Sequence, residues 1–182
     1  MNFFTSIILR LKAAQKSPPR LPLIEIFWSW LGSFLGILAV YLLHERFLTS
    51  LDLVFVIGSF GATAVLIYGA IESPLAQPRN LLGGHVISAL VGVTCWKLLA
   101  SHPELAGALA VSLAIVLMQF TRTLHPPGGA TALIAVIGSD KIHAQGYFYA
   151  LVPVLVGALV MLVIALAVNN LARSRRYPLY WL

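Results

Sequence analysis

Charged residues in this chain stand at the ends of long apolar runs and are nearly absent from their interiors. Only 10% of the 182 residues are charged and 59% are hydrophobic, whereas about a quarter of the residues of a soluble domain are charged. So few charged side chains cannot cover a surface that faces water. Apolar runs of about 20 residues therefore predict an all-α membrane protein.

The apolar runs divide into about six membrane segments, four of them continuous and two interrupted by small residues or prolines. In chain order the six segments are residues 24–43, 53–71, 84–100, 105–120, 123–137 and 147–168. The transmembrane domain is thus expected at residues 24–170. It lies between an amphipathic N-terminal segment at 1–23 and a cytoplasmic C-terminal tail at 171–182. We expect residues 1–23 to lie on the cytoplasmic surface as a helix, the alternative being a frayed terminus.

Basic residues cluster before the first segment and after the last one. Cytoplasmic loops carry an excess of Lys and Arg. Six crossings with both termini in the cytoplasm are therefore expected, in a multi-pass protein of the cell inner (plasma) membrane. The net charge of +6 is then a sign of topology and not of nucleic-acid binding.

The two interrupted segments contain the same short sequence. GATAVLI occupies residues 61–67 and GATALIA residues 129–135, and each lies between two continuous segments. The chain therefore reads as two repeats, at about 24–100 and 104–170. Three crossings in each repeat give the halves opposite orientations. Inverted repeats built around discontinuous helices are typical of transporters.

Each GATA sequence is expected to begin a short half-helix inside the membrane, one near Gly61 and one near Gly129. If residues 123–128 are extended, they descend about 20 Å into a hydrocarbon core about 30 Å thick. In the first repeat, residues 53–60 would descend from the other side, so the two helix starts meet near the midplane. Free backbone amides and the positive end of a helix dipole bind anions. The predicted substrate-binding residues are Ser59, Gly61, Ala62, Thr63, His125, Gly128, Gly129, Ala130 and Thr131.

Other interpretations of these residues stay open. Small residues in membrane helices are most often packing surfaces, and this explains the alanines of both GATA sequences as well as a site does. His125 is a ligand of the anion, a proton site or a structural cap. Four further residues are candidates for anion attraction or gating, with structural roles as the alternative: Arg79, Asn80, His85 and Arg122.

Several kinds of function are disfavoured by residues that the sequence does not contain. All six acidic residues fall at predicted segment ends, so no carboxylate is expected mid-span as a cation ligand or proton relay. The single cysteine, Cys95, offers neither an intrachain disulfide nor a metal cluster. The sequence has no nucleotide-binding loop, serine elbow or pair of catalytic carboxylates. No enzyme, metal or cofactor is therefore expected.

The stretch TRTLHPPGGATAL, residues 121–133, resembles the defining motif of the HPP family of small integral membrane proteins. GSFGATAVL, ESPLAQPRNLLGGH and the terminal NN…R…YP…W resemble the other blocks of this family in their usual order. The resemblance covers residues 28–181. Family members in cyanobacteria and plastids are associated with nitrite transport, which implies nitrite or a similar anion as the substrate here. The family is usually described with about four spans, but two broken segments would escape a hydropathy count, so we expect six.

Together these patterns predict transport of a small monovalent inorganic anion, nitrite first, through a midplane site formed by two opposed helix N-termini. Because six short segments barely enclose a pathway, a homo-oligomer, dimer or trimer, is expected. The main alternative is a non-transporting membrane sensor or assembly subunit, in which the HPP break packs or docks a partner. An intramembrane enzyme built on His125 is a third interpretation, for which no catalytic partner is evident.

Overall fold

Helices form every regular element among the residues that this computed structural model describes, which are 17, 19–48 and 57–182. The prediction of an all-helical protein is confirmed. The predicted N-terminal amphipathic segment lies almost entirely outside the described residues. The same holds for residues 53–56, the first part of the second predicted segment.

Within the described part of the chain, four helical stretches are long and apolar enough to cross a membrane: Leu23–Arg46, Pro78–Leu99, Pro103–Phe120 and Asp140–Leu171. The first contains α2 (Leu23–Leu43) and most of the turn η1 (His44–Leu48), the second is α4, and the third is α5. The fourth contains α7 (Asp140–Gln145), η5 (Gly146–Ala150), η6 (Leu151–Leu155) and α8 (Val156–Leu171).

Two apolar helices are shorter, and they are the two segments that the sequence predicts to be broken. The first is Ser59–Gly69, which comprises α3 (Ser59–Ala64) and η3 (Val65–Gly69). The second is α6 (Pro126–Ile137), whose 12 residues are about 18 Å long at 1.5 Å per residue. A helix of that length is too short for a hydrocarbon core of about 30 Å.

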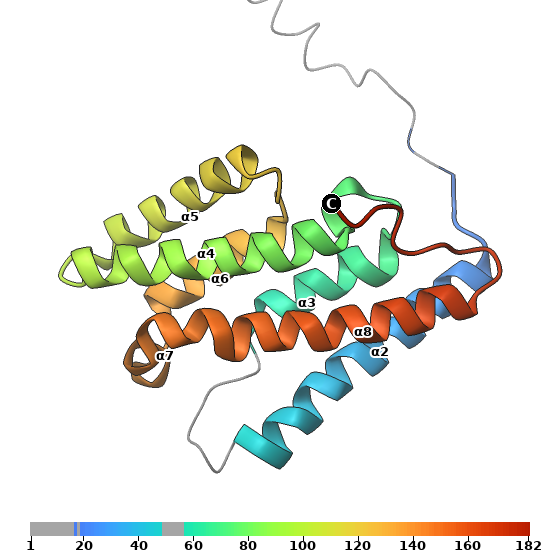
Figure 1. Ribbon diagram of the computed structural model, residues 1–182, viewed down its shortest axis with the longest axis horizontal. Helices are drawn as coiled ribbons and strands as arrows, with labels where there is room; N and C mark the ends of the chain where they lie inside the picture. Colours follow the sequence, from blue (N-terminus) through green and yellow to red (C-terminus); the bar gives the residue numbers. More distant parts are fainter. Residues whose placement is uncertain (1–16, 18, 49–56) are drawn as a thin grey trace, which may run out of the picture.

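The two short helices run in opposite directions among the long ones (Figure 1). α3 runs from the middle of the molecule toward the end where α2 begins, and α6 runs from the middle toward the end that carries α7. The start of α2 and the end of α8 lie together, and Glu25 forms an ion pair with Arg175 at 2.6 Å. The start of the first described span and the end of the last therefore lie at the same end of the molecule, as an even number of passages requires. The inverted repeat itself stays a prediction.

Protein groups satisfy the backbone at the ends of the short helices. The Asn169 amide donates to the carbonyl of Ile67 at 2.9 Å, and Arg175 donates to the carbonyl of Tyr68 at 3.2 Å. At the end of α6, His143 Nε2 lies 3.0 Å from the carbonyl of Val136. A carbonyl without a partner costs several kcal/mol in hydrocarbon. A helix can therefore end inside the bilayer only where such partners exist.

Several predicted boundaries are corrected. α6 begins at Pro126 and not near Gly129, because proline needs no amide partner in the first turn and has a helical φ. Only residues 123–125 precede it without helical structure, so the extended approach is about 10 Å long and not about 20 Å. α3 begins at Ser59 and not near Gly61. The third predicted segment begins at Pro78, six residues early, and α7 occupies most of a predicted loop.

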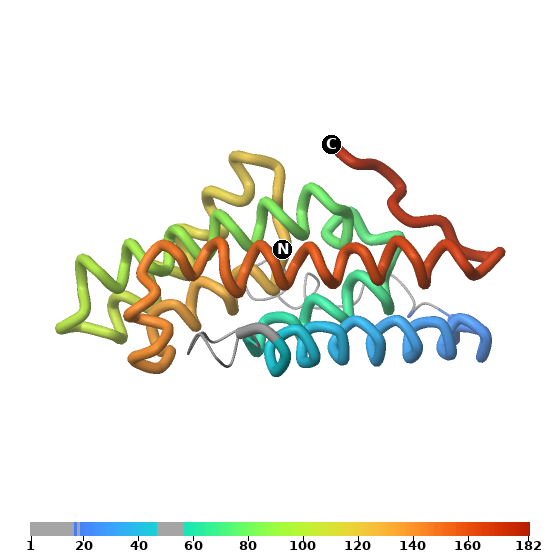
Figure 2. Tube along the Cα trace, turned by 60° about the horizontal axis from the view of Figure 1, so that its bottom comes forward, coloured from blue at the N-terminus to red at the C-terminus, as the bar shows by residue number. Residues whose placement is uncertain are grey.

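The C-terminal tail folds back along the molecule after α8 (Figure 2). The Tyr177 hydroxyl donates to the carbonyl of Ala76 at 2.7 Å, and the Leu179 amide donates to Gln77 Oε1 at 2.9 Å. Both contacts lie at η4 (Pro74–Ala76) and the residue that follows it. The tail therefore holds the loop that precedes α4, and this loop carries one carbonyl of the site described next.

Candidate functional site

Five polar side chains meet in the interior where α3, α4 and α6 pack together. Each of them has a relative exposure of 0%, and the five are Ser59, Thr63, His85, His125 and Thr131. We call this set the polar cluster. A polar group buried away from water costs free energy unless it is hydrogen-bonded. The partners of these side chains therefore determine what the cluster can do.

His85 of α4 connects the threonines of the two GATA sequences. Its Nε2 lies 2.7 Å from Thr63 Oγ1 in α3, and its Nδ1 lies 2.7 Å from Thr131 Oγ1 in α6. The ring of Phe60 packs against the imidazole of His85 edge to face, with centroids 5.7 Å apart. One histidine thus joins both short helices through one hydrogen bond to each.

His125 occupies the N-cap position of α6, but its side chain does not cap that helix. Its Nδ1 lies 2.8 Å from the carbonyl of Leu75 in η4, and its Nε2 lies 3.3 Å from Thr63 Oγ1. The rings of His125 and His85 meet at an interplanar angle of 61°, with centroids 4.9 Å apart. Thr63 therefore stands between two imidazole rings.

The two short helices lie side by side in opposite directions, and their N-termini do not face each other end to end. Ser59 Oγ, at the start of α3, is 2.9 Å from Thr131 Oγ1, which lies further along α6. Thr63, one turn into α3, instead reaches His125 at the start of α6. The Tyr149 hydroxyl donates to the carbonyl of Thr131 at 3.2 Å and fixes this turn from a third side.

The structure brings together only some of the predicted substrate-binding residues. Gly61 and Ala62 are exposed, and Gly129 and Ala130 line an apolar hollow of about 530 Å³ between α5 and α6. Gly128 is buried, and a Cβ atom there would lie 2.7 Å from Ser88 Oγ. These glycines and alanines are therefore exposed, line the hollow or pack against α4, whereas the polar cluster is made by side chains.

Two of the amides predicted to bind an anion have partners within their own turns. The Gly61 amide donates to the carbonyl of Gly58 at 3.2 Å, and the Gly128 amide donates to the carbonyl of His125 at 2.8 Å. In this conformation the groups that face one another at the cluster are thus hydroxyls and imidazoles.

Two of the four residues predicted for attraction or gating, Arg79 and Asn80, hold the turn between α5 and α6. Arg79 donates to the carbonyl of Thr121 and Asn80 to the carbonyl of Leu124, both at 2.8 Å. Arg122 is exposed, and its φ of 57° is the left-handed conformation that commonly ends a helix. The contacts of Arg79 and Asn80 match the structural alternative for these two residues.

The central position of His85 is the feature that the sequence interpretation missed. From the sequence, His85 is predicted only as a candidate for anion attraction or gating and not as a member of the substrate-binding set. A signal was present, because an ionisable side chain inside a membrane segment is by default a candidate functional residue. The partners of His85 could not be read from the sequence, since they lie 22 and 46 residues away.

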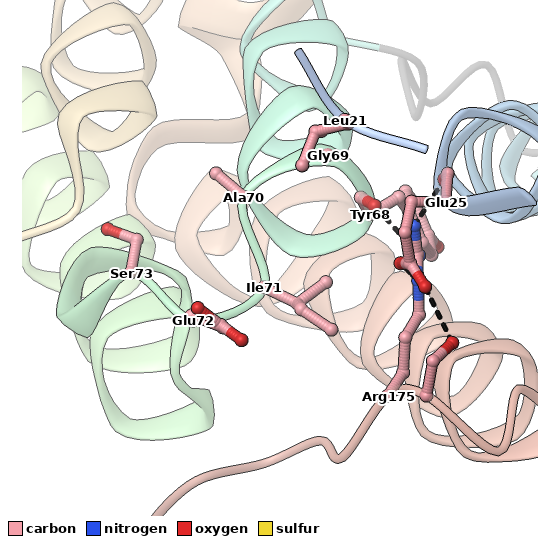
Figure 3. Close-up of a pocket in the computed structure, with 10 residues that line it drawn as sticks. Leu21, Glu25, Tyr68, Gly69, Ala70, Ile71, Glu72, Ser73 and Arg175 are labelled. Carbon is pink, nitrogen blue, oxygen red and sulfur yellow. Dashed lines mark hydrogen bonds and ion pairs between the residues drawn. The ribbon is translucent and has the colours of Figure 1, made fainter. Parts of the chain in front are cut away.

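A second group of polar residues lies where α2, η3 and the C-terminal tail meet (Figure 3). Arg175 donates to five acceptor atoms, on Glu25, Ser29, Tyr68 and Asn169. A cavity of about 320 Å³ adjoins it. Because all the donors of Arg175 point at protein groups, its evident role is to join the tail to α2 and to the end of η3.

Comparisons with known proteins agree with the membrane assignment. A family model described as "HPP, transmembrane region" matches residues 18–178. One curated protein of Dictyostelium discoideum, described as a transmembrane protein, is 52% identical over 182 residues, which is 98% of this chain and 58% of the relative. A second, described in the same way, is 54% identical over 169 residues, 91% of this chain and 59% of the relative. The chain thus spans less than two thirds of the length of these relatives. No solved structure matches.

Proposed function

The chain belongs to the HPP family of integral membrane proteins, and from this premise we propose that it transports a small monovalent inorganic anion, nitrite first, across the membrane. The observation that carries the proposal is the polar cluster, because it lies where two helices too short to span a bilayer overlap. Discontinuous helices that meet inside the membrane form the substrate sites of many transporters.

The chemistry of the polar cluster suits an anion. Three hydroxyls and two imidazoles can each donate a hydrogen bond, and the side chains of the cluster include no carboxylate. A cation such as Mg²⁺ or Ca²⁺ takes oxygen ligands, typically carboxylates. The first turns of α3 and α6 add the positive ends of two helix dipoles. Nitrite carries one negative charge and accepts hydrogen bonds, so it matches donors arranged in this way.

In this structure the cluster is closed, so transport requires α3 and α6 to separate. The weakest point for an anion to enter is the contact between Ser59 and Thr131, which consists of two hydroxyls 2.9 Å apart. An anion between them would accept a hydrogen bond from each, and the hydroxyls would lose only their contact with each other. The closed form then corresponds to an occluded state between openings to the two sides.

The remaining assignments follow from the same premise. The protein is a multi-pass membrane protein, and we place it in the cell inner membrane with both termini in the cytoplasm, because basic residues cluster at the end shared by α2 and α8. A homo-oligomer, dimer or trimer, would enclose the pathway. The proposed activity is transport, without catalysis, cofactor or metal.

One observation favours the second candidate, a non-transporting sensor or assembly subunit. Every polar side chain of the cluster is fully buried and has a partner inside the protein. Such a network could equally serve to fix the packing of α3 against α6.

Uptake into proteoliposomes that contain the purified protein tests the proposal. Nitrite would be compared with nitrate, formate and chloride, and Thr131→Val would remove the hydroxyl between His85 and Ser59. Thr94→Val is the matched control, because Thr94 lies in an exposed region of α4 and contacts Leu90 and Tyr147. We expect nitrite uptake that Thr131→Val abolishes and Thr94→Val retains.

Two results would contradict the proposal. Uptake that survives in folded Thr131→Val would exclude the polar cluster as the site. No uptake of any tested anion by folded wild-type protein would reject transport of these anions and favour the subunit.

A further inference from the structure

The polar cluster is one continuous line of hydrogen-bonding groups. Starting from the Leu75 carbonyl, the line passes through His125, Thr63, His85, Thr131 and Ser59, with separations of 2.8, 3.3, 2.7, 2.7 and 2.9 Å. A hydroxyl can donate and accept at once, and a neutral imidazole donates at one nitrogen and accepts at the other. The hydrogens of such a line can be ordered in either direction.

The Leu75 carbonyl fixes one end of the order in the neutral state. A carbonyl only accepts, so His125 Nδ1 carries a hydrogen and neutral His125 accepts at Nε2. Thr63 then donates to His125, and His85 donates to Thr63 from Nε2. For the order to continue, Thr131 donates to His85 Nδ1 and Ser59 donates to Thr131. The Thr131 hydroxyl must then turn away from Ser59 Oγ, to which it donates in the structure. In this arrangement every ring nitrogen and hydroxyl oxygen of the line has a partner.

One added proton reverses the whole order without leaving a group unpaired. A proton that arrives at Ser59 Oγ displaces the serine hydrogen onto Thr131, whose hydrogen moves to His85 Nδ1. His85 passes its Nε2 hydrogen to Thr63, and the hydrogen of Thr63 moves to His125 Nε2. His125 is then an imidazolium that donates to both Leu75 and Thr63, and His85 has changed tautomer. The proton balance is one taken up at Ser59 and one held at His125.

We propose that this line is a proton relay ending at His125, and that the protein moves its anion together with a proton. The inference rests on the anion transport proposed above and adds how that transport is coupled. The proton comes from hydronium or from the conjugate acid of the anion at Ser59. When His125 releases it, the hydroxyls turn back to the neutral order.

Electrostatics favours a site that holds both charges or neither. A single buried charge loses its hydration, and a neutral cluster offers only dipoles to an anion. An imidazolium at His125 supplies the opposite charge within the same line. Moving the pair together also removes the work of carrying a net charge against the membrane potential.

The surroundings of the relay contain few other groups that titrate. The titratable side chains at the line are His85 on α4, His125 at the start of α6, and Tyr149 of η5, which reaches the carbonyl of Thr131. α3 contributes hydroxyls and the Phe60 ring, and α5 contributes Met118, 3.6 Å from Ser88 Oγ. A proton taken up by the line therefore goes to an imidazole.

Nitrogen NMR of ¹⁵N-histidine-labelled protein tests the relay without any transported ion. His85→Gln and His125→Asn would assign the signals. As the pH falls, we expect His125 to gain a proton at Nε2 and His85 to change from the Nε2–H to the Nδ1–H tautomer in the same step. A His85 ring that keeps one tautomer over the whole pH range in which the protein stays folded would overturn the relay.

Uptake into proteoliposomes then tests the coupling. With one proton moved per anion, each pH unit by which the exterior is more acidic than the vesicle interior should raise the final ratio of internal to external nitrite about tenfold. The leak into protein-free vesicles is subtracted. His125→Asn keeps an amide donor toward Leu75 but cannot hold a proton, so it should lose this dependence. His143→Gln is the matched control, because His143 contacts Val136 outside the line, and it should retain the dependence.

The possible outcomes separate the two proposals. Protein-dependent uptake that ignores the pH gradient would overturn the coupling and leave anion transport standing. A complete lack of uptake would remove the transport proposal and the coupling with it, while the tautomer measurement would still decide the relay.

Discussion

Two neighbouring glycines in the first turn of α6 provide a direct test of how closely that helix must approach α4. A Cβ atom at Gly128 would lie 2.7 Å from Ser88 Oγ, 2.9 Å from the backbone oxygen of Gly84 and 3.0 Å from Met118 Sδ. A Cβ atom at Gly129 would meet only Val111 Cγ1, at an ordinary 3.8 Å. The same substitution by alanine should therefore have opposite effects at the two positions.

The magnitudes follow from these contacts. Alanine in a helix is more stable than glycine by roughly 0.5–1 kcal/mol, and overpacking of a close contact costs typically 1–3 kcal/mol. The Gly84 oxygen belongs to the backbone of α4 and cannot turn away. Gly128→Ala should then lower the free energy of unfolding by about 0.5–2 kcal/mol, whereas Gly129→Ala should raise it by up to about 1 kcal/mol.

The single cysteine supplies the assay. Cys95 is buried in α4, so a thiol-reactive fluorescent dye reports the opening of that helix as detergent-solubilised protein is heated. At roughly 2–4 °C per kcal/mol for a chain of this size, Gly128→Ala should melt lower than wild type and Gly129→Ala at the same temperature or higher. If the two variants melt together, the close approach of α6 to α4 is not what holds the site.

Three further predictions concern the elements that frame the polar cluster. Arg122→Gly should stabilise the protein by about 1 kcal/mol, because glycine adopts the left-handed conformation without steric cost. Nitrite uptake should be retained in this variant. Reduced uptake would instead support a role for Arg122 in attracting the anion. Arg175→Gln should lower the free energy of unfolding by about 3 kcal/mol, since it leaves Glu25 and several carbonyls with fewer partners. If Arg175 and Glu25 act as a unit, adding Glu25→Gln should change the free energy of unfolding little further, which a double-mutant cycle would measure. Burial raises the pKa of Tyr177 above its ordinary value, so its neutral form should stabilise the docked tail at all pH values below about 10. Above that pH the free energy of unfolding should fall in the wild type, and it should fall less in Tyr177→Phe. Melting temperatures in a pH series would measure this difference.

Much of the polar cluster could be anticipated from the sequence. Ser59, Thr63, His125 and Thr131 were predicted to share a site because each lies at or near the start of an interrupted segment, and the structure places them within one line of hydrogen bonds. Gly61 and Ala62, predicted for the same site, point elsewhere. Residues one or two apart on a helix lie on different faces, whereas Ser59 and Thr63, four apart, share one. The prediction treated a whole helix start as a site, although only one face of it turns inward.

Hydropathy by itself determined the membrane class and the long apolar segments, because burial in lipid acts on each stretch of chain through its own composition. Proline and glycine marked where the short helices lie, since their backbone preferences are local. Only the tertiary structure decided that His85 stands between Thr63 and Thr131, and that the Leu75 carbonyl orients His125. Those contacts depend on the rotation and depth of three packed helices, which close packing between distant segments sets and no local pattern records.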